Sequence, residues 1–385
     1  RNPRRSQFPL VFVLSLLLLQ SLLFTLVATM GRRFRQFREN VRGKFKETRN
    51  KLMNPEVKQR VFDEMGDDKP KILSADIVMI SGCEDSQTSA DVSNVGNFQL
   101  PDPAGRAGGA CTSTLLNVLY KDEQTPAATL SFIEVLDQMR DSLKDNGYTQ
   151  IPQLTSSKEL DLNDKFDLVP DKFKGTRRAV MIGINYVGHN PGELAGCHND
   201  VGNMKKYIMN VHGFDESNIT VLMDDGQHTP PTKDAILAAY KEVVEASEPG
   251  DAIFLHYSGH GSKVADSSGD EADGYDEVLV PLDFQEVGMI ADDDLYNLFI
   301  KKLPQGVHVV SLMDCCHSGT ILDLPFVFQD DGDFGGAAPM MSLDQNFDWK
   351  KVLNGPLAEK IQGILGDKID LNDVTGNLGK LGIKF

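Results

Sequence analysis

Two short glycine-containing motifs supply a histidine and a cysteine that could act together in nucleophilic catalysis. The first spans residues 257–261 (YSGHG) and the second spans residues 314–319 (DCCHSG), and each directly follows an apolar run. A thiol attacks a carbonyl group as the thiolate, and histidine is the usual base that produces it. Glycines on both sides of His260 allow the backbone to turn tightly there. His260 and Cys316 are therefore the candidate catalytic pair.

Each of these residues alone is weak evidence, and the other cysteines offer little competing chemistry. A single histidine at a strand end is more often structural, and a single cysteine is more often a small buried hydrophobe. The chain has five cysteines and no CxxC pair, so neither a disulfide framework nor a structural zinc site is expected. The adjacent Cys315 and Cys316 leave a thiol redox sensor open as a minor alternative, because a vicinal disulfide ring is strained.

The elements that must hold these motifs read as an α/β fold. Strands are expected at 76–80, 179–184, 219–223, 251–257, 277–281 and 307–314, and helices at 110–119, 129–146, 201–211, 233–246 and 292–302. Short apolar strands that alternate with helices predict three layers around a mostly parallel sheet. In such sheets, sites form beyond the carboxyl ends of the strands, which is where both motifs lie.

The motifs YSGHG and DCCHSG, with GCHND at residues 196–200, resemble the signature of the metacaspases, a family of caspase-like cysteine peptidases. A histidine about 50 residues before the cysteine is also the caspase order. The resemblance extends from Arg178 to about Asp323, the large subunit of the family. It implies the three-layer caspase-like (caspase/hemoglobinase) fold. It also implies Cys316 as nucleophile, His260 as general base, and an oxyanion hole made by the backbone N–H groups of Gly261 and Cys316.

The order of the two subunit regions resembles that of type III metacaspases. Residues 80–91 (ISGCEDSQTSAD) resemble the start of the family's small subunit, which here precedes the large one. The expected regions are 71–149 (small-subunit-like), 150–177 (a linker), 178–330 (large-subunit-like and catalytic) and 331–385 (a C-terminal extension). The usual linker between subunits is absent, which places in doubt a role for cleavage between them in activation. The expected strand at 76–80 can still join the sheet.

The loops around the site are acidic, which predicts a preference for basic substrates. By resemblance, the substrate-binding residues are Cys197, Asp200, Ser258 and Asp314. A pocket lined by carboxylates favours Arg or Lys and repels Asp. An alternative for Asp200 is the N-cap of the helix expected at 201–211.

An acidic stretch suggests a calcium site. Residues 263–294 contain eleven Asp and Glu residues and one Lys, and Ca²⁺ prefers several hard oxygen ligands. By resemblance, the calcium ligands are Asp276, Asp292, Asp293 and Asp323. The alternative is a solvated acidic loop with acids in the first turn of a helix, because the EF-hand spacing is absent.

Charge is distributed unevenly along the chain. Residues 1–60 hold 14 Lys and Arg against 3 Asp and Glu, and the remainder holds 25 against 53. The acidic body argues against a nucleic-acid partner. The apolar run at 8–27 fits a membrane anchor or a secretory signal within residues 1–30, whereas a start at Met30 would give a cytoplasmic protein. Residues 31–70 form a basic amphipathic segment that either lies on a membrane or packs on the body.

The sequence thus predicts a monomeric, calcium-dependent cysteine endopeptidase. It would cleave protein or peptide substrates after Arg or Lys through an acyl-enzyme, and itself at exposed sites such as Lys172, Lys174, Arg177 or Arg178. A non-catalytic, calcium-binding module with a caspase-like fold is the alternative, although the presence of both His260 and Cys316 counts against it. A role in programmed cell death would rest on family analogy alone.

Overall fold

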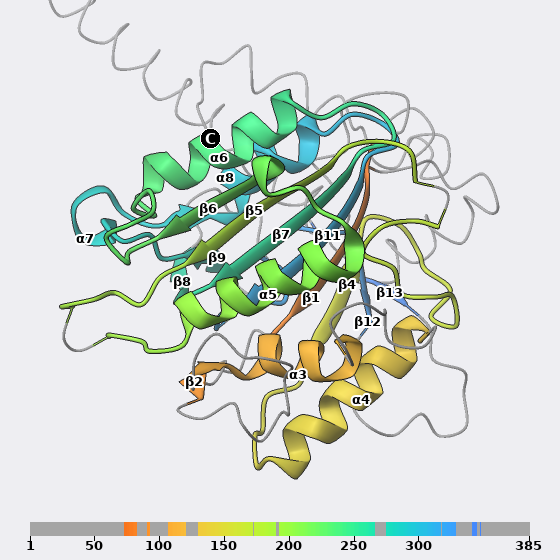
Figure 1. Ribbon diagram of the computed structural model, residues 1–385, viewed down its shortest axis with the longest axis horizontal. Helices are drawn as coiled ribbons and strands as arrows, with labels where there is room; N and C mark the ends of the chain where they lie inside the picture. Colours follow the sequence, from red (N-terminus) through yellow and green to blue (C-terminus); the bar gives the residue numbers. More distant parts are fainter. Residues whose placement is uncertain are drawn as a thin grey trace, which may run out of the picture. The chain divides into compact units, whose positions relative to one another are not determined.

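An eight-stranded β-sheet lies at the centre of the structure, with the strand order β13-β12-β4-β1-β11-β7-β5-β6 (Figure 1). The strands are β1 (Asp76–Ser81), β4 (Gln153–Ser156), β5 (Arg177–Gly183), β6 (Ile219–Met223), β7 (Ala252–Ser258), β11 (His308–Asp314), β12 (Phe326–Phe328) and β13 (Ser342–Leu343). The five from β1 to β6 in this order are parallel, and the other three join antiparallel. This sheet confirms the expected α/β fold, and β1 joins it beside β11.

This computed structural model describes residues 73–82, 91–92, 107–120, 130–171, 173–189, 192–265, 275–316, 318–328, 341–344 and 347. All of them belong to one compact unit, residues 65–352. The segments 1–30 and 31–70 and most of the C-terminal extension lie outside the described residues. None of the helices in the described ranges is long and apolar enough to cross a membrane.

Helices cover both faces of the sheet. On one face lie α5 (Cys197–His212), α3 (Ala110–Leu119) and α4 (Phe132–Asp145), where α5 packs on β5 and β7 and α3 packs on α5 and β11. On the other face lie α6 (Lys233–Glu245) and α8 (Asp292–Leu298), packed on the apolar side chains of alternate strand positions. Parallel strands covered on both faces need continuous apolar sequence, and all seven residues of β7 are buried.

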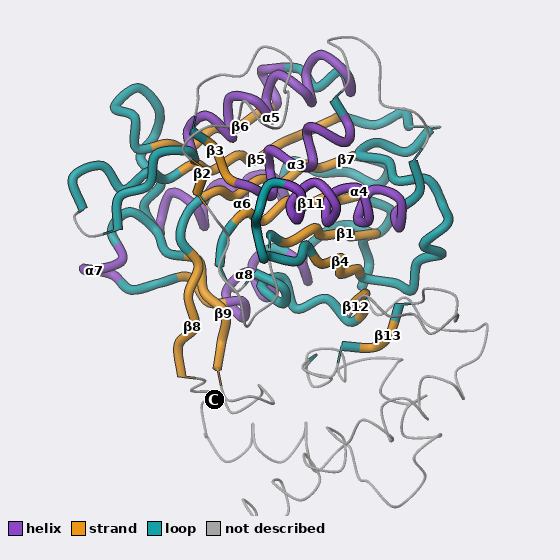
Figure 2. The backbone as a smooth tube through the Cα atoms, turned by 90° about the horizontal axis from the view of Figure 1, so that it is seen from below, coloured by secondary structure: helices purple, strands orange, loops and turns teal. Residues whose placement is uncertain are grey.

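Smaller elements surround the central sheet. A second sheet contains β8 (Gly261–Ala265), β9 (Tyr275–Leu279) and β10 (Ile290–Ala291), and Figure 2 shows β8 and β9 running side by side out of the body. A short pair is made by β2 (Asp91–Val92) and β3 (Gly108–Gly109). The short helices are η3 (Glu216–Asn218), α7 (Phe284–Val287) and η4 (Ile300–Lys302).

Three expectations were wrong in detail. The linker expected at 150–177 contains β4, whose four residues (QLTS) are buried but carry no apolar period that reveals a strand. Helix α5 begins at Cys197, four residues earlier than expected, because its first turn is polar. Within the extension expected at 331–385, β13 joins the sheet edge, and Met341 and Phe347 are buried.

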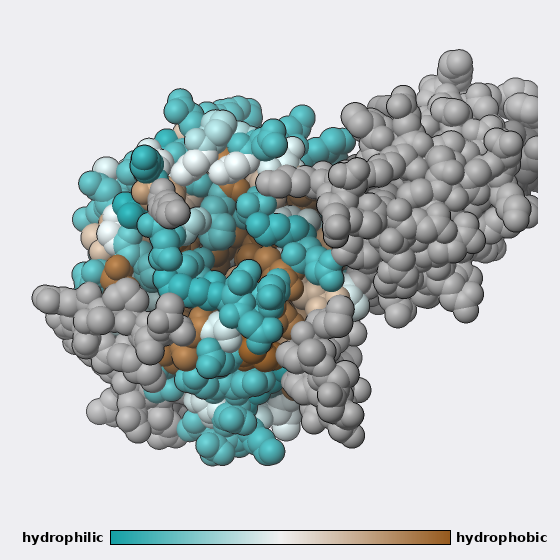
Figure 3. Space-filling model, turned by 90° about the vertical axis from the view of Figure 1, so that its right-hand side faces the viewer, coloured by the Kyte–Doolittle hydropathy of each residue, from teal (hydrophilic) through white to brown (hydrophobic). Residues whose placement is uncertain are grey.

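The side of the molecule where the parallel strands begin is shown in Figure 3. Its described surface is largely polar, with a more apolar area at the centre. The two glycine motifs lie at the opposite end of the strands, because both follow the last residue of a strand.

Candidate active site

The parallel register of β7 and β11 brings the two glycine motifs together at one edge of the sheet. Ser258 pairs with Asp314, so His260 and Cys316 each follow that pair by two residues. The N–H of Gly259 approaches the carbonyl oxygen of Asp314 at 3.5 Å. A Cβ atom on Gly261 would collide with the carbonyl oxygen of Cys316, so a glycine is required at this close approach.

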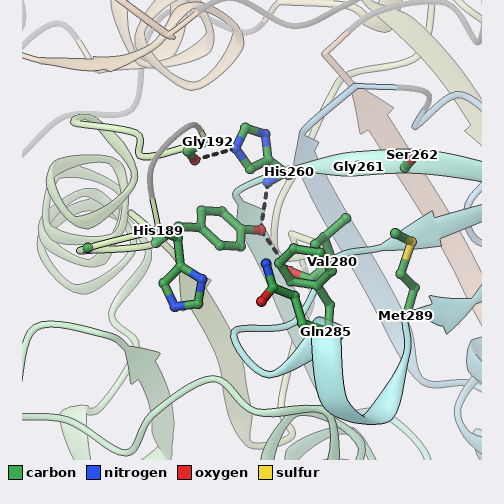
Figure 4. A pocket seen from close by; sticks show the side chains of 11 residues that line it. His189, Gly192, His260, Gly261, Ser262, Val280, Gln285 and Met289 are labelled. Carbon is green, nitrogen blue, oxygen red and sulfur yellow. Dashed lines mark hydrogen bonds between the residues drawn. The ribbon is translucent and has the colours of Figure 1, made fainter.

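The His260 ring is held from two sides (Figure 4). Its Nε2 atom lies 2.7 Å from the carbonyl oxygen of Gly192, and its ring packs on Tyr186 with centroids 4.6 Å apart. A carbonyl oxygen can only accept a hydrogen bond, so we assign the proton to Nε2 in the neutral ring. Nδ1 is then the nitrogen that can accept a proton from a thiol.

Tyr186 also holds the backbone of His260 in place. Its hydroxyl accepts the backbone N–H of His260 at 2.9 Å and donates to the carbonyl oxygen of Val280 at 2.7 Å. Burial raises the pKa of this hydroxyl well above its usual value, so it remains protonated. Tyr186 has a φ of 53°, a conformation that few non-glycine residues adopt.

The turn that contains Tyr186 is fixed by Asp224, which follows β6. Its two carboxylate oxygens accept the N–H groups of Asn185 and Val187 at 2.9 and 3.0 Å, and His198 Nε2 lies 2.6 Å away. Burial alone would raise the pKa of Asp224, but these hydrogen bonds outweigh it and lower the pKa. Sequence reasoning missed both Asp224 and Tyr186, since neither belongs to a recognisable motif.

The two adjacent cysteines have different environments. Side chains alternate between the faces of a strand, and Cys315 continues the face of Met313 into the apolar core under α6 and α8. Cys315 is 1% exposed, whereas Cys316 is partly exposed at the sheet edge. Accessibility therefore favours Cys316 as the nucleophile.

On the opposite face of the sheet, Asp200, Ser258 and Asp314 form a buried acidic cluster, which is called the acidic pocket below. Ser258 Oγ donates to Asp200 Oδ2 at 2.7 Å. The N–H of Gly109 donates to both oxygens of Asp200 at 2.9 and 2.8 Å, and the N–H of Thr112 donates to Asp314 Oδ2 at 2.8 Å. The start of α3 thus lies against both carboxylates, and a Cβ on Gly109 would collide with Asp314.

This pocket overturns the N-cap interpretation of Asp200. The N-cap of α5 is Gly196, and Asp200 lies in the first turn with its carboxylate turned to Gly109 and Ser258. Cys197 is buried at the start of the same helix, where its N–H donates to Asn185 Oδ1 at 3.0 Å. All four predicted substrate-binding residues therefore lie near the carboxyl edge of the sheet.

The charge of the acidic pocket is concentrated in buried groups. Asp200 and Asp314 are 1% and 5% exposed. The neighbouring His256 bonds to Thr112 Oγ1 at 3.2 Å, and burial lowers its pKa to about 3, so it adds no positive charge near pH 7. A cationic ligand side chain would find strongly attractive partners here, because charges interact more strongly away from water.

A second group of carboxylates could hold a metal ion. One oxygen each from Asp292, Asp293 and Asp323 lie within 4.8 Å of one another. Asp292 is 1% exposed and Asp323 is 5% exposed, and buried like charges this close are costly without a cation. Three carboxylate oxygens would supply part of the roughly six to eight hard oxygen ligands that Ca²⁺ takes. Asp276, the fourth predicted ligand, lies buried on β9 and is not part of this group.

Comparisons with known proteins found matches in both the small-subunit-like and the large-subunit-like regions. A family model described as "Metacaspase, peptidase C14 domain" matches residues 177–325, and one described as "Caspase domain" matches residues 29–163. Metacaspase III c of Phaeodactylum tricornutum is 61% identical over 298 residues, which cover 77% of this chain and 87% of that protein. Metacaspase-1 of Cryptococcus neoformans is 39% identical, covering 54% of this chain and 46% of that protein. A solved Geobacter sulfurreducens protein is 33% identical over 38% of this chain and 53% of its own, with a TM-score of 0.30.

Proposed function

Because this chain belongs to the metacaspase family of caspase-like cysteine peptidases, we propose that it is a calcium-dependent endopeptidase that cleaves proteins or peptides after Arg or Lys. The observation that carries the catalytic assignment is the register of β7 and β11, which gives His260 and Cys316 equivalent positions at one sheet edge. The Gly192 carbonyl and the Tyr186 ring then orient the histidine.

The chemistry follows from these positions. His260 Nδ1 accepts the proton of Cys316, and the thiolate attacks the carbonyl carbon of the scissile peptide bond. The backbone N–H groups of Gly261 and Cys316 stabilise the oxyanion. His260 returns the proton to the leaving amine as the C–N bond breaks. Water, deprotonated by His260, then hydrolyses the thioester and releases the new carboxylate and the thiol.

Specificity for Arg or Lys is proposed from the acidic pocket. Asp200 and Asp314 lie on the side of the sheet that α3 and α5 cover. Ser258, at the end of the strand that leads to His260, donates a hydrogen bond to Asp200. A cationic side chain offsets the mutual repulsion of the two carboxylates, whereas an Asp side chain would add a third negative charge. The small-subunit-like region contributes directly, because Gly109 and Thr112 hold these carboxylates.

Calcium dependence is proposed from the group of Asp292, Asp293 and Asp323. Asp323 lies in the loop that follows Cys316, whereas Asp292 and Asp293 begin α8. Bound Ca²⁺ would supply positive charge that holds these two segments together. The loop after the nucleophile would then be ordered by the metal.

We expect activity on peptides ending in Arg or Lys to be lost in chelator and restored by added Ca²⁺. Asp323→Asn should raise the calcium concentration needed for half-maximal activity by about tenfold or more, since it removes one charged ligand. The matched control is Asp294→Asn, since Asp294 is a half-exposed acid in the same first turn of α8. Equal activity in chelator and in calcium, or cleavage after Asp instead, would contradict the proposal.

Self-cleavage is proposed at Lys174. Lys172 lies outside the described residues, and Arg177 and Arg178 belong to the central strand β5, where Arg178 also pairs with Asp251 at 3.4 Å. Lys174 is exposed in the segment before that strand, which is the kind of site that proteases reach. Mass spectrometry of calcium-treated protein should find a new terminus after Lys174 that is absent in Lys174→Ala. Cleavage inside β5 instead would show that the folded sheet does not protect it.

A further inference from the structure

A cavity of about 560 Å³ lies beside His260, and the acidic pocket does not account for it (Figure 4). One wall is His260 with Gly261, and Val280, Phe284 and Met289 supply apolar surface. Polar side chains come from Tyr186, His189, Ser262 and Gln285. Its volume falls in the range of pockets that enclose a small molecule, so it has room for one large side chain.

The cavity and the acidic pocket lie on opposite faces of the sheet. Tyr186 and Val280 belong to the apolar core under α6 and α8, and Phe284 and Met289 pack against that core. Asp200 and Asp314 instead face the start of α3. His260 and Cys316 follow β7 and β11, two neighbouring strands of the sheet that separates the cavity from the acidic pocket. A peptide with its basic side chain in the acidic pocket must therefore pass over this edge of the sheet before its next residue can reach the cavity.

The direction of that crossing follows from the proton transfers. The general acid that protonates the leaving amine lies beside the residue that follows the scissile bond. His260 is that acid, and it forms a wall of the cavity. The cavity is also adjacent to the proposed oxyanion hole, because Gly261 lines it and contacts the carbonyl of Cys316. The residue after the cut is thus directed to the cavity, and the residue before it to the acidic pocket.

We propose that this cavity binds the side chain of the residue immediately after the cleaved bond and selects an uncharged, apolar one such as Leu, Met or Phe. This inference rests on the proposed function. No Lys, Arg, Asp or Glu is among the described residues that line the cavity. A charged side chain placed there would lose water, and this lining offers it no side chain of fixed opposite charge in return. An apolar side chain has no such hydration to lose, and it buries its surface against Val280, Phe284 and Met289.

The test uses internally quenched peptides with Arg before the bond and either Leu or Glu after it. The wild type should cleave the Leu peptide with a kcat/KM about tenfold or more above that for the Glu peptide. Gln285→Lys adds a cation at the cavity and should reduce this ratio by about tenfold, because the Glu side chain gains a partner. The matched control is Val287→Lys, two residues along α7, where Val287 is 52% exposed and does not line the cavity. It should leave the ratio unchanged.

Two outcomes would overturn the inference while leaving the proposed function intact. One is a Leu-to-Glu ratio near one in the wild type, with both peptides cut after Arg. The other is an equal shift in the two lysine variants, which would indicate a general effect of charge rather than contact in the cavity. If dye amides that end at Arg are not cleaved at all, the proposed function itself fails, and this inference fails with it.

Discussion

Replacement of Cys316 by alanine is expected to lower kcat/KM for cleavage after Arg by at least about 10³-fold, whereas Cys315→Ala should stay within a few-fold of the wild type. The two cysteines are neighbours in sequence but differ in environment. Cys315 is buried in the core under α6 and α8, and Cys316 is partly exposed at the sheet edge. Without the Cys316 sulfur no acyl-enzyme forms, and the oxyanion donors and substrate binding alone remain.

The measurement is steady-state cleavage of an Arg dye amide in calcium, paired with alkylation and mass spectrometry. Iodoacetamide should modify Cys316 before Cys315, because burial hinders access to the Cys315 thiol. Thermal unfolding of both variants controls for folding, since Cys315→Ala leaves a small void in the core. Full activity in Cys316→Ala, or loss confined to Cys315→Ala, would show that the nucleophile is misassigned.

The sheet could be predicted from the sequence because its central strands are apolar on both faces. β1, β7 and β11 are such short apolar runs, and the structure has them, with the edge strand β6, within a residue or so of the expected bounds. β4 escaped prediction because its sequence, QLTS, is polar at three of its four positions. Its burial is imposed by β1 and β12 on either side of it, and no local pattern reports such neighbours.

The candidate site, like the sheet, could be predicted only in part. Motifs pointed to the candidate residues that would react or carry charge, because the two glycine-containing motifs are specific when they occur together. The residues that hold them were not visible in the sequence. Gly109 is 91 residues from Asp200, and Tyr186 is 74 residues from His260. Such contacts exist only once the sheet has formed, so spacing along the chain carries no trace of them.

Asp314→Asn is expected to lower kcat/KM for a peptide with Arg before the bond by about 10²-fold, with little effect on the same peptide carrying citrulline. Citrulline is a neutral side chain with the shape of Arg, so it isolates the effect of charge. The asparagine oxygen can still accept the N–H of Thr112, so the start of α3 should remain in place. The loss then measures the missing carboxylate rather than a collapsed pocket.

The control is a carboxylate of equal burial elsewhere. Asp251 is also 5% exposed, and its oxygens accept the N–H groups of Thr176 and Glu248 at 2.7 and 3.0 Å, before the start of β7. Asp251→Asn should lower the melting temperature and leave the Arg-to-citrulline ratio unchanged. If Asp314→Asn instead lowers both substrates equally, Asp314 acts by holding the start of α3. The preference for basic residues would then rest on Asp200 alone, and Asp200→Asn would become the variant that removes it.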